Sequence, residues 1–377
     1  MVSKLAQIDI CNQNHITYSY QSLKALVSNY ISGEKVLVAG GSSKDDIVDL
    51  PSEFLVIYHQ GLKVSSFTST LVPAIPDNQL TGNFGKVCFV GAFAANCRGK
   101  LVVGHQTRLY EYNIRTRNWS KLPSTYKDRY GASSCNIGSK KFIICGGTRH
   151  GGSAEIFHFD EIDDPRSIHQ PASLTYWAKF QKNEWEKLAI SDNNNTNSEQ
   201  NTPHWGCPSK LPVKVCYQTM IELQDGGIMM IGGCQVNGSP SNRVFIGHLT
   251  DDETDVAWKE AASMNNPRLE HIAFRLGSDI YVAGGIGAAD TTSATCEKYC
   301  MIKNEWEIIS FSLPYPLNGA SVVVGKDETF ALVIGGRINN KVVSNKVIVF
   351  TKEKGFSENR SFQLKSTRHG HVSLITE

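Results

Sequence analysis

A short apolar run that ends in two glycines recurs along the chain. It occurs at 36–41, 142–147, 228–233, 280–285 and 331–336, and a degenerate copy ends at His105. The second glycines of the last three copies, at 233, 285 and 336, are 52 and 51 residues apart. Regular recurrence at this distance indicates a repeat architecture, because one such unit cannot bury its apolar face alone.

Each unit carries the pattern of several short strands. A second apolar run precedes each doublet across a tight polar turn, which is typical of a β-hairpin. Downstream, Tyr112 precedes Trp119 by seven residues and Tyr299 precedes Trp306 by seven. The run before each doublet is continuously apolar, as expected for a strand that is buried on both faces. The sequence therefore predicts an all-β protein with about four strands in each unit.

The doublet, followed by tyrosine and then tryptophan and often preceded by an arginine, resembles the kelch repeat. The resemblance extends from about residue 22 to the C-terminus, and the spacing of about 50 residues is also that of kelch units. It implies a kelch-type β-propeller that forms a single domain over residues 1–377.

The number of blades follows from the spacing. A further doublet is expected near residue 387, beyond the last residue of the chain, and 371–375 looks like a first strand. We therefore predict seven blades, one of them split between the C-terminal strand and residues 4–20. Six blades, with residues 1–20 as an appendage, remain the alternative. The long step from 147 to 233 includes a polar stretch at 191–210, which we predict to be a disordered loop.

Composition narrows the classes of function. The 38 basic and 36 acidic residues leave a formal charge of +2, too small for a chain-wide nucleic-acid surface. No apolar run reaches the roughly 18 residues that a membrane-spanning helix needs. The first ten residues lack the apolar core of a secretory signal. The ten cysteines are therefore expected to be reduced thiols of a cytoplasmic protein.

One rim of the propeller is the predicted binding face. Strands two and four of a blade end at the same rim, so the residues after each doublet and before each first strand gather there. Arginine and tyrosine are frequent at binding hot spots, which favours a cationic rim that captures an acidic or phosphorylated segment. In the alternative, an arginine before a first strand belongs to the repeat and holds backbone carbonyls. The predicted partner-binding residues are Arg129, Tyr130, Arg149, His150, Tyr217, Arg268, Tyr315, Arg337 and Arg368.

The sequence indicates no metal or cofactor site. His369 and His371 lie close along one strand without an identifiable third ligand, and the Cys296–Cys300 spacing is too long for a shared metal or a disulfide. The favoured function is a non-enzymatic protein-interaction module. The resemblance implies a scaffold near the actin cytoskeleton or a substrate adaptor of a ubiquitin ligase. The alternative is a carbohydrate-modifying enzyme that uses Glu270 and Arg268 in the central funnel.

Overall fold

The structure is a computed structural model, and it describes most of the repeat region. The described residues are 34–43, 52–60, 63–72, 91–97, 99–137, 141–148, 151–159, 204–205 and 209–376. Within them the regular secondary structure consists of β-strands and one short 3-10 helix, η2 (Ala288–Asp290). No helix among these residues has the length and apolar character that crossing a bilayer requires.

Six antiparallel sheets of at least four strands occur in the described residues, and we number them in chain order. Sheet 1 has the strand order β28 (His369–Ile375), β1 (Glu34–Ser42), β2 (Ser52–Gln60), β3 (Lys63–Val72). Sheet 2 has the order β4 (Phe93–Cys97), β5 (Lys100–His105), β6 (Arg108–Asn113), β7 (Asn118–Leu122). Sheet 3 has the order β8 (Ser133–Asn136), β9 (Lys141–Cys145), β10 (Ser153–His158), and both β11 (His204–Trp205) and β12 (Ser209–Lys210) pair with β10.

The remaining sheets follow the same pattern. Sheet 4 has the order β13 (Thr219–Glu222), β14 (Ile228–Ile231), β15 (Val244–Leu249), β16 (Val256–Ala261), and sheet 5 has the order β17 (Ile272–Leu276), β18 (Asp279–Ala283), β19 (Thr295–Cys300), β20 (Glu305–Ser312). Sheet 6 has the order β22 (Ser321–Val324), β23 (Phe330–Ile334), β26 (Lys346–Thr351), β27 (Gly355–Gln363). A small sheet joins β21 (Leu317–Asn318), β24 (Arg337–Ile338) and β25 (Val342–Val343).

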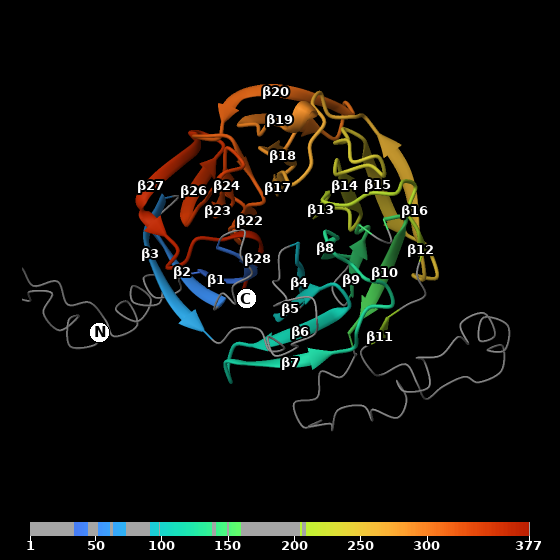
Figure 1. Ribbon diagram of the computed structural model, residues 1–377, viewed down its shortest axis with the longest axis horizontal. Helices are drawn as coiled ribbons and strands as arrows, with labels where there is room; N and C mark the ends of the chain where they lie inside the picture. Colours follow the sequence, from blue (N-terminus) through green and yellow to red (C-terminus); the bar gives the residue numbers. More distant parts are fainter. Residues whose placement is uncertain are drawn as a thin grey trace, which may run out of the picture.

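The sheets stand around a common axis, with β28, β4, β8, β13, β17 and β22 innermost (Figure 1). The predicted all-β class is confirmed, and each doublet-bearing run is the second strand of its sheet. These strands are buried along most of their length, and β23 is buried throughout, from Phe330 to Ile334. Full burial of one such side chain contributes roughly 1.5–3 kcal/mol.

The hydrophobic core lies between neighbouring sheets. Six apolar clusters occur in the described residues, and each joins two consecutive sheets. Tyr299 and Trp306 of sheet 5, with ring centroids 4.9 Å apart, pack in this way on sheet 4. One cluster joins Val36 and Val38 of sheet 1 to Leu332 of sheet 6. The packing of sheets therefore continues across the join between the two ends of the chain.

The split sheet differs from the prediction in its partner. Residues 371–375 do form an innermost strand, but β28 pairs with β1, in a register that places Val36 opposite Ile375 and Ser42 opposite His369. The predicted partner, residues 4–20, lies outside the described residues. The prediction of a seventh blade built from residues 4–20 and this strand is therefore wrong in its pairing.

The predicted loop at 191–210 also needs a correction at its end. Residues 204–205 and 209–210 are short strands against β10, with Trp205 opposite Phe157 and Lys210 opposite Ser153. Residues 191–203 and 206–208 lie outside the described residues.

Candidate functional site

Six residues, each at or just before an innermost strand, form a closed ring of backbone hydrogen bonds, which we call the axial ring. Each residue donates its N–H to the carbonyl oxygen of the ring residue on the preceding sheet. The circuit runs Gly91 to Gly370 (3.0 Å), Gly370 to Gly319 (2.8 Å), Gly319 to Glu270 (2.9 Å), Glu270 to Tyr217 (3.1 Å), Tyr217 to Gly131 (2.7 Å) and Gly131 to Gly91 (3.3 Å).

All six ring residues have a positive φ. Four are glycines, for which this conformation carries no steric penalty. The other two are Tyr217 and Glu270, both with φ near 53°. A side chain in the left-handed region costs roughly 1–2 kcal/mol. These two residues are therefore strained positions that lie next to each other in the ring.

Three of the predicted rim arginines are inside the protein. Arg129, Arg268 and Arg368 are at most 1% exposed. Each forms an ion pair with a fully buried glutamate on the third strand of its own sheet. The pairs are Arg129 with Glu155 at 2.6 Å, Arg268 with Glu297 at 3.0 Å and Arg368 with Glu53 at 2.7 Å. The prediction that these guanidinium groups form the rim surface is wrong, because their charge is already buried and paired.

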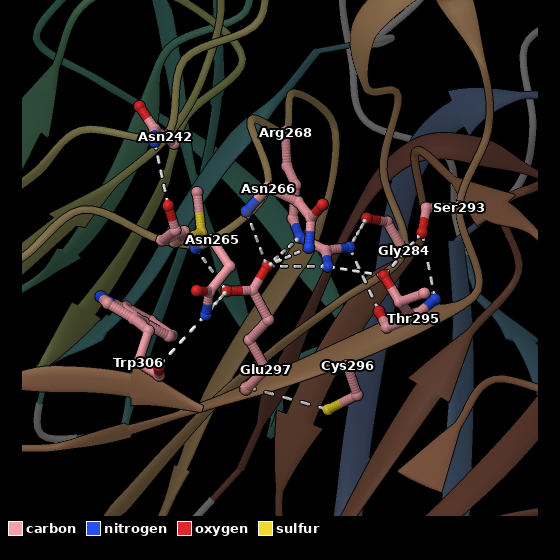
Figure 2. A network of polar contacts seen from close by, with 11 residues as sticks. Asn242, Asn265, Asn266, Arg268, Gly284, Ser293, Thr295, Cys296, Glu297 and Trp306 are labelled. Atoms are coloured by element: carbon pink, nitrogen blue, oxygen red, sulfur yellow. Dashed lines mark hydrogen bonds and ion pairs between the residues drawn. The ribbon is translucent and has the colours of Figure 1, made fainter. Parts of the chain in front are cut away.

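Figure 2 shows the Arg268 site in sheet 5. Its Nη1 donates to the carbonyl oxygens of Gly284 (2.7 Å) and Thr295 (3.1 Å), and Nη2 donates to Thr295 Oγ1 (2.7 Å). Arg129 makes the equivalent bonds to Gly146 and Ser153. The arginine thus closes the connection between the second and third strands. This is the role given as the alternative in the sequence analysis, in which an arginine before a first strand belongs to the repeat and holds backbone carbonyls.

The paired carboxylate holds the segment that leads to the arginine. Glu297 accepts the backbone N–H groups of Asn265 (2.7 Å) and Asn266 (3.1 Å), three and two residues before Arg268. The other two sites repeat the pattern with the same offsets, through Tyr126 and Lys127 on Glu155 and through Lys365 and Ser366 on Glu53. A buried carboxylate with several donors is well compensated.

Sheets 4 and 6 have apolar residues in place of the ion pair. In sheet 6, Leu317 stands two residues before the ring position and Ile348 faces Val333, as Glu297 faces Val282 in sheet 5. In sheet 4 the pair is Val215 and Phe245, and all four of these side chains are buried. In both sheets a proline stands three residues before the residue that replaces the arginine: Pro212 before Val215, and Pro314 before Leu317. Because proline has no N–H, no buried acceptor is needed there.

The partly exposed residues of the predicted rim are Tyr130, Tyr217, Tyr315 and Arg337. The rings of Tyr130 and Tyr217 meet edge to face at 6.2 Å. Arg337 Nη2 lies 2.9 Å from His369 Nε2. Tyr315 packs instead against the core of sheets 5 and 6, with Lys346 Nζ 5.2 Å above its ring. Arg149 and His150 lie outside the described residues.

Glu270 projects from the axial ring without a cationic partner among the described residues. Its Oε2 accepts a hydrogen bond from Asn318 Nδ2 at 2.8 Å. Arg268, two residues away in sequence, is engaged by Glu297. The Glu270–Arg268 pair on which the alternative enzymatic function depended is therefore not formed.

His369, His371 and Cys296, which the sequence analysis considered as possible metal ligands, are buried in the protein. Both histidines of the C-terminal strand are buried, and His371 Nε2 lies 2.8 Å from Ser321 Oγ. Burial lowers the pKa of His371 well below its usual value, and Arg368 lowers it further. Cys296 is buried and burial raises its pKa to about 12. Within the part of the chain that the structure describes, no group of three or more potential ligands could hold a metal.

Sequence reasoning missed the axial ring and the glutamate partners of the arginines. A local signal for the ring exists in Arg129-Tyr-Gly131 and Arg368-His-Gly370, where a glycine follows the arginine by two residues. The glutamates lie 26 and 29 residues after Arg129 and Arg268, so no short motif connects them.

Comparisons with known proteins give one distant similarity and no family assignment. No protein-family model matches the chain. Over 101 residues, 26% of the chain, it is 28% identical to Alpha-scruin, a kelch-repeat protein of Limulus polyphemus. The match spans only 11% of the length of Alpha-scruin. The similarity agrees with the kelch resemblance of the repeats but is too short to establish membership of the family.

Proposed function

We propose that the chain is a six-bladed kelch-type propeller that binds another protein through the face carrying the axial ring. The closed ring of hydrogen bonds and the six inter-sheet clusters support this architecture. Because β28 pairs with β1 and the resulting sheet packs on sheet 6, the ring of sheets closes on itself. A closed ring has no sheet at a free end, which suits a rigid binding platform.

The observation that carries the proposal is that some of the predicted rim residues are buried in the repeat while others are partly exposed near the axial ring. The buried arginines serve the repeat, whereas Tyr130, Tyr217, Glu270 and Arg337 remain partly exposed around the ring. Aromatic and arginine side chains on an open surface are typical of protein-binding hot spots. Because three predicted cations are buried with glutamates, the acidic-segment version of the hypothesis loses its main support.

A cytoskeletal partner is the first to test, because the kelch resemblance implies it. Purified protein is sedimented with actin filaments, and the bound fraction is measured over a range of filament concentrations. We expect the wild type to bind, and the double variant Tyr130→Ala/Arg337→Ala to bind at least 10-fold more weakly. Lys259→Ala, an exposed position on outer strand β16, is the matched control and should bind as the wild type does.

The two possible failures have different meanings. If the wild type does not sediment with filaments, actin is not the partner. If it does, and the double variant binds equally well, the ring face is not the binding surface.

A further inference from the structure

The two strained residues of the axial ring place an acid and an aromatic ring side by side. Glycine would satisfy the backbone at both positions, as it does at the other four. Non-glycine residues held at positive φ cluster at functional sites, where the surrounding structure holds the strained conformation. Tyr217 and Glu270 are linked directly by the hydrogen bond between the Glu270 N–H and the Tyr217 carbonyl.

Glu270 and Asn318 form an acceptor-rich corner. The Glu270 carboxylate receives one side-chain donor, Asn318 Nδ2, and no cation of the described residues pairs with it. Asn318 is itself 1% exposed, and its Oδ1 has no hydrogen-bond partner. A buried acceptor without a partner is unfavourable. The corner therefore has the capacity to accept further N–H groups. Arg337, on β24, is directed to His369 instead.

The aromatic side of the corner comes from Tyr217 and Tyr130. The Tyr217 ring lies over Gly131, where an added Cβ would approach its Cε1 to 2.9 Å. The Tyr130 ring packs edge to face against it. Burial raises the pKa of the Tyr217 phenol, and Tyr130 and Glu270 raise it further.

We propose that Tyr217 and Glu270, supported by Asn318, form a subsite for a cationic lysine or arginine side chain of a bound protein. A carboxylate gives charge-assisted hydrogen bonds to an ammonium or guanidinium group, and a tyrosine face adds a cation–π contact. This inference rests on the proposed binding face and reverses the charge of partner that the arginine-rich sequence indicated.

The test uses short peptides, so that it does not depend on the identity of the partner. The probes are the pentapeptides Gly-Gly-Lys-Gly-Gly and Gly-Gly-Arg-Gly-Gly, with blocked ends, and two controls in which the lysine is Nε-acetylated or replaced by glutamate. Dissociation constants are measured by NMR titration at low ionic strength, where we expect values near the millimolar range for at least one cationic probe. The two control peptides should bind at least 10-fold more weakly.

Matched variants locate the subsite. Glu270→Gln keeps the shape of the side chain and should weaken binding of the cationic peptides about 10-fold. Glu270→Gly, which also removes the strain, should do the same if the fold is kept. Glu307→Gln removes an equal charge on outer strand β20 and should have no effect. Thermal unfolding of each variant shows that a loss of binding is not a loss of fold.

The inference is overturned if acetylated and free lysine peptides bind equally, or if Glu270→Gln binds as the wild type does. If no peptide binds but actin filaments are still bound through Tyr130 and Arg337, the subsite is rejected and the proposed function stands.

Discussion

Replacing Arg268 with leucine should destabilise the protein strongly, and a specific pair of further substitutions should restore it. In Arg268→Leu, the Glu297 carboxylate stays fully buried without its cation, and the carbonyls of Gly284 and Thr295 lose donors. Removing one partner of a buried ion pair costs about 3–5 kcal/mol. The single variant is therefore expected to lose this amount of unfolding free energy.

The double variant Arg268→Leu/Glu297→Ile should recover only part of the loss. It removes the buried charge but leaves the N–H groups of Asn265 and Asn266 without their acceptor. Asn265 is exposed and Asn266 is half-buried, so each N–H that loses its acceptor should cost about 1 kcal/mol, the low end of the range for a buried donor. Adding Asn265→Pro removes one of these donors. The triple variant then reproduces the arrangement of Pro314, Leu317 and Ile348 in sheet 6.

The backbone is suited to this transplant. The residue before the proline position makes the same hydrogen bond in both sheets, from Met264 N to Asn242 O and from Leu313 N to Ala294 O, each at 2.9 Å. We expect the triple variant to lie within about 2 kcal/mol of the wild type, since it also loses the Asn265 side-chain bond to Trp306.

Urea unfolding, followed by tryptophan fluorescence and by circular dichroism, measures all three variants. Arg243→Ala is the control, because the Arg243–Glu260 pair is about half exposed and should contribute less than about 1 kcal/mol. The reasoning is refuted if the single variant is as stable as the triple one, or if the double variant is the least stable of the three.

Three further predictions concern strain, pH and thiol reactivity. Glu270→Gly should keep or raise the unfolding free energy by up to about 1 kcal/mol, because relief of roughly 1–2 kcal/mol of strain exceeds the added chain entropy of glycine; a loss above 1 kcal/mol in urea would contradict this. The pKa of His271 is lowered to about 3, by burial and then by Arg268. Below its unfolded pKa of about 6.5 the unfolded chain therefore binds a proton that the folded protein does not, so the free energy of unfolding is highest above that pH and decreases as the pH falls. The cost is about 2 kcal/mol at pH 5, and His271→Gln, which copies Gln218 of sheet 4, should reduce the fall of the urea midpoint between pH 7 and pH 5 without removing it, because buried His371 acts in the same direction. Burial raises the pKa of Cys145 to about 12, so iodoacetamide should label it in the native protein far more slowly than the partly exposed Cys300, as mass spectrometry of peptides can measure; equal labelling would show that sheet 3 opens readily.

The elements of this protein can be recognised from short stretches of sequence. The continuous apolar runs before each doublet, such as Ile228–Ile231, are second strands, and the run at 371–375 is a first strand. The equally spaced pairs Tyr112–Trp119 and Tyr299–Trp306 are each in ring contact. These features depend on side-chain pattern and turn chemistry over a few residues, so the sequence alone determines them.

Tertiary structure decided which strand meets the C-terminal strand and which arginines reach the surface. Pairing of β28 with β1 joins residues more than 300 positions apart, and no local pattern encodes that partner. Arg268 and Arg337 were both expected at the rim, yet Arg268 is buried because Glu297 on the third strand and the carbonyl oxygens of Gly284 and Thr295 accept its hydrogen bonds. The ring conformation of Tyr217 and Glu270 likewise exists only where six sheets meet, because hydrogen bonds from two neighbouring sheets hold each residue in it.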